Sequence, residues 1–70
     1  MKPDASDLME LARDLYRYLV RFHPEDTTDS QRQKVVSAMV HIVPRTSLQL
    51  VPHVTDTVIE QETLSLYSQK

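Results

Sequence analysis

The chain has 70 residues, with eight Lys and Arg against ten Asp and Glu, a formal net charge of −2, and neither glycine nor cysteine. Without glycine it lacks the phosphate-binding Gly-rich loop, the dinucleotide fingerprint and the nucleophile elbow. Without cysteine it lacks disulfides, thiolate zinc sites and a cysteine nucleophile. We therefore expect no enzyme activity, no cofactor and no metal, in an all-α compact bundle of three to four short helices.

The first predicted helix runs from Pro3 to Phe22. Asp4 or Ser6 can cap its N-terminus, and His23-Pro24 ends it, because the residue before a proline avoids the α region. Its apolar residues recur at steps of three and four, the spacing of one helical stripe: Leu8, Leu11, Ala12, Leu15, Tyr18, Leu19 and Phe22.

The second predicted helix runs to about Val43, after a polar turn in which Thr28 or Asp29 serves as the cap. Its many β-branched residues would suit a strand, but the apolar residues come in pairs and triplets rather than alternating, which favours a helix. Pro44 ends it.

The rest of the chain predicts a short helical segment at Leu48–Val51 and a last helix from His53 to about Leu66, separated by a restart or kink at Pro52. The stripe of the last helix begins with Val51, Val54 and Val58 and then drifts around the surface. One domain over residues 1–70, with an ordered core of about 4–66, accounts for the pattern.

The second helix is the best candidate for a binding surface. Seven of the nine residues between Val35 and Val43 are apolar, so the helix is either buried on all sides or presents part of its face to a partner. The weak stripe of the last helix favours the second interpretation. We expect the contact surface to consist of Val36, Met39, Val40 and Val43, flanked by Tyr16.

The aromatic residues of the first helix differ in their position relative to the apolar stripe of that helix. Tyr18 and Phe22 lie on or beside it and are expected in the core. Tyr16 points away from it, and tyrosine is frequent among residues that dominate binding energy. Tyr16 is therefore a candidate interface anchor, although an ordinary surface tyrosine fits equally well.

A basic ridge offers an alternative function. Arg13, Arg17 and Arg21 recur every four residues and could bind a nucleic acid or an acidic lipid surface. Glu10 and Asp14 lie close enough along the helix to pair with them instead. The negative net charge argues against a dedicated nucleic-acid binder and favours a solvated helix face.

The remaining polar residues indicate no chemistry. No two of the histidines His23, His41 and His53 have the spacing that places two metal ligands on one helix face. Ser37 and His41 are four residues apart, but no third group orients them. The hydroxyl-rich turn of residues 27–30 fits a helix cap or a phosphorylation segment.

One short motif resembles a known family. Tyr18-Leu19, with Thr27 eight residues after the leucine, resembles the spacing of LisH dimerisation motifs. His23 stands where those motifs have glycine, and Pro24 where they have an aromatic or aliphatic residue. The resemblance implies dimerisation, and with these departures it does not assign the chain to the family.

The expected function is that of a non-catalytic protein–protein interaction or dimerisation module of a larger scaffold or regulatory protein. A core of this size seldom supplies more than about 3–5 kcal/mol, so a partner or a second copy is an expected source of stability. We expect another protein or a homodimer as partner, no membrane span, and a cytoplasmic or nuclear location.

Overall fold

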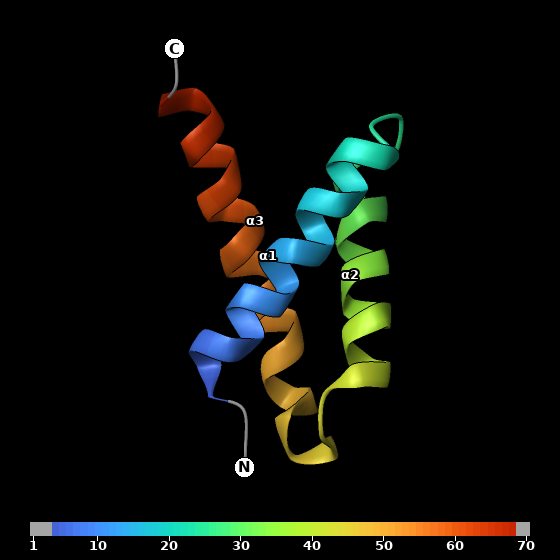
Figure 1. The fold of residues 1–70 in the computed structure, drawn as a ribbon, viewed down its shortest axis with the longest axis vertical. Coiled ribbons are helices and arrows are strands. Elements are labelled where there is room, and N and C mark those ends of the chain that lie inside the picture. Colours follow the sequence, from blue (N-terminus) through green and yellow to red (C-terminus); the bar gives the residue numbers. More distant parts are fainter. Residues whose placement is uncertain (1–3, 69–70) are drawn as a thin grey trace.

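The computed structural model describes the backbone of residues 4–68 and the side chains of residues 4–65. Four helices follow one another in this part of the chain, without a strand: α1 (Ala5–Phe22), α2 (Thr28–Ile42), the 3₁₀ helix η1 (Arg45–Leu50) and α3 (Val51–Ser68). Helices α1 and α2 run antiparallel, and α3 returns beside them so that each α-helix packs on the other two (Figure 1). The prediction of an all-α helical bundle is confirmed.

Helix α1 begins with a reciprocal cap at Asp4. Its Oδ1 accepts a hydrogen bond from the backbone N–H of Asp7 at 2.9 Å, and Asp7 Oδ2 accepts one from the N–H of Asp4 at 3.3 Å. The pair satisfies N–H groups that have no partner within the helix. Of the two predicted caps, Asp4 is therefore the one used, and the helix begins at Ala5.

Helix α2 is capped by Thr27, so the prediction of Thr28 or Asp29 as the cap is wrong. Thr27 is extended, and its Oγ1 accepts a hydrogen bond from the N–H of Ser30 at 3.1 Å. Thr28 and Asp29 already belong to the helix. Three consecutive residues here can all cap a helix, and only the path of the chain out of α1 selects one of them.

Helices α1 and α2 both end before a proline, as predicted. Helix α1 ends at Phe22 and α2 at Ile42, and in each case one residue separates the helix from Pro24 or Pro44. Helices often end with a glycine of positive φ. No residue in the described part of the chain has a positive φ, so the prolines end these helices without it.

The prediction of two separate segments after Pro44 is wrong in its boundaries. Helix η1 begins at Arg45 and passes directly into α3 at Val51, with Pro52 as the second residue of α3. Proline is tolerated there because the first N–H groups of a helix have no partner within the helix. Pro52 therefore lies inside the last helix and does not restart it.

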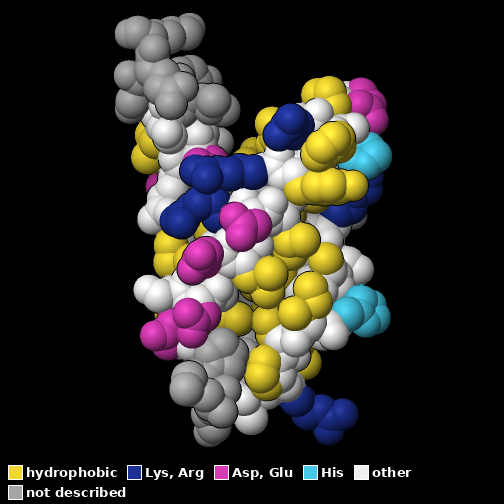
Figure 2. All heavy atoms as spheres, in the orientation of Figure 1, with side chains coloured by type: hydrophobic (Ala, Val, Ile, Leu, Met, Phe, Trp, Pro, Cys, Tyr) yellow, Lys and Arg dark blue, Asp and Glu magenta, His cyan; other side chains and the backbone are white. Residues whose placement is uncertain are grey.

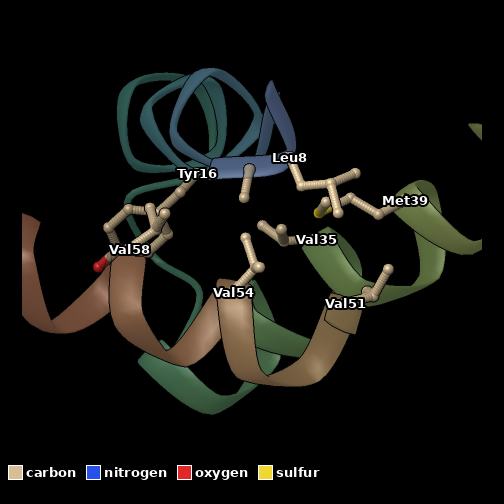
Figure 3. Packing of buried hydrophobic residues seen from close by; sticks show 8 residues of the cluster. Leu8, Tyr16, Val35, Met39, Val51, Val54 and Val58 are labelled. Carbon is tan, nitrogen blue, oxygen red and sulfur yellow. The ribbon is translucent and has the colours of Figure 1, made fainter. Parts of the chain in front are cut away.

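The core lies where the three α-helices meet (Figure 3). The valine stripe predicted for the last helix is confirmed, since Val51, Val54 and Val58 are all buried. Thr55 is buried beside them, and its hydroxyl donates to the carbonyl of Val51 at 2.8 Å. The buried apolar residues are Leu8, Ala12, Tyr16, Val35, Met39, Val51, Val54 and Val58.

None of the described helices combines the length and the apolar composition that crossing a bilayer requires.

Candidate functional site

Helix α1 carries two adjacent rows of apolar side chains, and the rest of the chain fully covers only one of them. The first, here called the inner row, consists of Leu8, Ala12 and Tyr16, which are 1%, 0% and 8% exposed. Residues four apart lie on one helix face, and this face packs against α2 and α3. The inner row is the contribution of α1 to the core.

The second row, here called the outer row, consists of Leu11, Leu15, Tyr18 and Phe22. Leu11 and Leu15 are half-buried and pack against the edge of the core, whereas Tyr18 and Phe22 are 55% and 56% exposed. The two rings lie 4.8 Å apart between centroids. Tyr18 and Phe22 therefore form an aromatic pair that is more than half exposed at the C-terminal end of α1.

The outer row lies on the side of α1 that faces away from α3 and toward α2, because Arg13 and Arg17, on the other side of the inner row, contact side chains of α3. Figure 2 shows hydrophobic side chains gathered on the α2 side of α1, whereas charged side chains cover its α3 side. Ile42, at the end of α2, adds a further apolar side chain that is 59% exposed. It shares a helix face with buried Val35 and Met39, so the face that fills the core extends beyond the core at this end.

The predicted burial of the aromatic residues is wrong. Tyr16, expected to point away from the stripe, is buried in the core, while Tyr18 and Phe22, expected in the core, are exposed. The apolar arc of α1 is wide, and α1 packs through the edge of the arc that contains Tyr16. This rotation leaves the opposite edge of the arc uncovered.

The contact surface predicted on α2 is divided by the fold. Met39 is completely buried, and Val36 and Val43 are half-buried against the core. Only Val40 is exposed, at 45%. Met39 and Tyr16 therefore belong to the core of the single chain and are not available to a partner, whereas Val36, Val40 and Val43 form a narrow edge.

Two of the three seams between the α-helices are closed on the outside by polar side chains. Across the α1–α3 seam, Arg17 pairs with Glu62 and Arg13 donates to the Gln61 side chain at 3.3 Å. No ion pair joins α1 to α2 among residues 4–65. The outer row lies on the α2 side of α1, and its apolar side chains remain open to a partner.

The α2–α3 seam is closed by a charged pair. The Arg32 guanidinium donates two hydrogen bonds to the Asp56 carboxylate. These hydrogen bonds hold the pKa of Asp56 below its usual value and raise the pKa of Arg32. Both side chains remain solvent-accessible, so the contribution of the pair to stability is small.

The basic ridge does not remain a single free surface. Arg13 and Arg17 are engaged by side chains of α3. Arg21 lies apart from them, with its guanidinium carbon 5.4 Å from the centre of the Phe22 ring. Polyanion binding through the ridge stays a prediction, and two of its three groups would have to leave existing contacts to take part.

The other polar candidates remain dispersed. His23, His41 and His53 are all exposed and lie at separate places along the chain, and the His23 side chain lies near Glu25 and the Tyr18 ring. Within the described residues, no group of three or more His, Cys, Asp and Glu side chains could hold a metal ion. Thr27 is occupied as the cap of α2.

Sequence reasoning detected the apolar arc of α1 but not its division into two rows. The available signal was the spacing: the inner row steps by four and four, and the outer row by four, three and four. The second pattern is typical of a seam between two long helices. It is the row that this chain leaves incompletely covered.

Comparison of the chain with protein-family models, curated proteins and solved structures gives no match.

Proposed function

We propose that the chain is a non-catalytic protein–protein interaction or dimerisation module, a unit of a larger scaffold or regulatory protein, that binds its partner through the outer row of α1. The observation that carries this proposal is the exposed aromatic pair, Tyr18 and Phe22, on a row that continues through Leu11 and Leu15. The mode of binding is the packing of one helix face against another helix or into a groove.

The composition of the outer row supports binding rather than chance exposure. Tyrosine and arginine are enriched among the residues that dominate binding energy; Tyr18 belongs to the row, and Arg21 lies beside it. Burying apolar surface contributes about 25 cal/mol per Å², so covering two large rings that are more than half exposed is a substantial gain. A domain with a small core benefits from that gain more than a large one does.

Photo-cross-linking in cells tests the proposal. Phe22 is replaced by p-benzoylphenylalanine, a cross-linker of similar aromatic character, and Glu60 on the exposed surface of α3 is replaced in a matched control. We expect a discrete protein adduct from position 22 and none from position 60. The adduct can be a second copy or another protein, and mass spectrometry identifies it.

A surface variant shows whether the outer row is responsible. Tyr18→Lys removes one ring, and lysine suits the C-terminal half of a helix in both propensity and charge. We expect this variant to keep its helical circular dichroism and to lose the adduct from position 22. A folded variant that keeps the adduct, or equal adducts from positions 22 and 60, would overturn the proposal.

A further inference from the structure

The outer row has the spacing of a helix–helix seam. Its members, at positions 11, 15, 18 and 22, follow one another at steps of four, three and four residues. This is the repeat by which two helices pack side by side with interlocking side chains. At a rise of 1.5 Å per residue, the row extends over about 17 Å, or three helical turns. A second helix of the same length can cover it.

One acidic and one basic side chain lie beside the row, so two copies of this surface can pair through opposite charges. Asp14 and Arg21 are seven residues apart, and each immediately precedes a member of the row, Leu15 or Phe22. They therefore lie along the same edge of it. Both are exposed, and neither has an ion-pair partner among the described residues.

We propose that the occupant of the outer row is the outer row of a second copy of this chain, packed antiparallel, with Asp14 of each copy paired with Arg21 of the other. The inference rests on the proposed function, because it requires the row to be a binding surface. It adds the identity of the partner, the orientation of the two helices and their register.

The antiparallel register satisfies both the apolar and the charged side chains. With the two-fold axis between Leu15 and Tyr18, Leu11 lies opposite Phe22 of the other copy, and Leu15 lies opposite Tyr18. In an antiparallel helix pair like edges meet, so Asp14 lies near Arg21 of the other copy, and the two-fold axis forms this pair twice.

A parallel arrangement leaves the same charges unpaired. There the edge that carries Asp14 and Arg21 meets the opposite edge of the other helix. That opposite edge contains Ala12 and Leu19, which belong to or pack against the core of their own chain. Only the antiparallel arrangement gives each charge an opposite charge, and a single chain carries both halves of the pair. A second copy is therefore the partner that this edge matches.

The expected dimer is weak. Three helical turns bury less than the roughly 800 Å² per partner of a standard stable interface. Association is therefore expected to depend on concentration within a range of about 1 μM to 1 mM. Sedimentation equilibrium of the full chain over this range, with circular dichroism on the same samples, measures it.

Two charge reversals test the register. Asp14→Arg places two arginines opposite two arginines in a homodimer, and Arg21→Asp places two aspartates opposite two aspartates. Because like charges in contact across an interface are costly, we expect each variant to associate at least about tenfold more weakly than the wild type. Glu60→Arg on α3 is the matched control, with association unchanged.

Mixing the two variants gives the decisive result. A heterodimer of Asp14→Arg with Arg21→Asp has two opposite-charge pairs, so the mixture is expected to recover association to within about threefold of the wild type. The double variant D14R/R21D is expected to recover it as a homodimer. No rescue, in folded samples, would overturn the antiparallel pairing.

The outcomes separate this inference from the proposed function. A wild-type chain that stays monomeric up to about 1 mM overturns the second copy as partner. If position 22 nevertheless cross-links to another protein, the interaction module stands and only the self-pairing fails. If position 22 yields no adduct either, both proposals fail.

Discussion

Tyr16 and Tyr18 lie two residues apart in one helix, yet the first is 8% exposed and the second 55%. Successive helical residues are separated by about 100°, so two residues are enough to move a side chain from one edge of an apolar arc to the other. The arc of α1 is wider than the surface that α2 and α3 cover. The contrast between the inner and outer rows shows that an apolar stripe need not be a core, even in a domain that has little core to spare.

The largest expected effect on stability comes from disrupting the core residues that pack on the inner row. Met39 is fully buried among the residues that pack on this row, so Met39→Asp places a charge in the core. We expect the loss to exceed about 4 kcal/mol, because both the packing and the solvation of the carboxylate are lost. That loss is comparable to the roughly 3–5 kcal/mol that the core of a domain of this size supplies, so circular dichroism should show a largely unfolded chain.

This variant also decides between the two interpretations of α2. A folded Met39→Asp chain that had lost only its association would contradict the burial of Met39 and restore α2 as the binding surface. The unfolded result would assign α2 to the core.

Substituting alanine for Tyr16 and for Tyr18 in turn compares the inner and outer rows directly. Tyr16→Ala leaves a cavity in the inner row and is expected to cost about 3 kcal/mol. Tyr18→Ala removes a side chain that is mostly in water and is expected to cost about 1 kcal/mol or less. Chemical denaturation of the two variants measures the difference, and equal losses would mean that the two rows are not distinct.

The smallest expected effect concerns a seam that is closed by charge. Arg32 lowers the pKa of Asp56 below its ordinary value of 3.8. A carboxylate with a lowered pKa stabilises the folded state above its ordinary pKa, and this contribution is lost as the pH falls through the lowered value. The wild type should therefore be slightly more stable than Asp56→Asn at pH 6.

Thermal unfolding of both proteins from pH 6 to pH 2 follows this difference. We expect it to disappear at the acid end of the range, below pH 3.8. A difference that stays constant with pH would show that the Arg32–Asp56 pair contributes nothing through its charge.

The elements of the fold could be predicted because their signals are local. The cap at Asp4 and the helix ends before Pro24 and Pro44 depend on a few neighbouring residues, and the structure has them as expected. The errors also have local causes. Three successive residues can cap α2, and a proline such as Pro52 is as compatible with a first helical turn as with a break.

The candidate site could be predicted only in outline. The sequence indicates that α1 and α2 have more apolar residues than one narrow stripe requires, and it places Asp14 and Arg21 seven residues apart. It does not indicate which edge of the apolar arc of α1 faces inward, because Leu8, Leu11, Tyr16 and Tyr18 are all apolar or aromatic and could each face the core. The prediction consequently included Met39 and Tyr16, which are core residues, in a contact surface together with Val36, Val40 and Val43.

The sequence by itself determined that the described chain is helical, where its helices end and how its charges are spaced, since these follow from backbone geometry and neighbouring side chains. The tertiary structure decided the rotation of α1 about its own axis, and with it which tyrosine is buried and which seam stays open. That rotation depends on how α2 and α3 pack against α1 together, and on where Arg13 and Arg17 find partners on α3. Such contacts join residues far apart in the chain, and no local pattern encodes them.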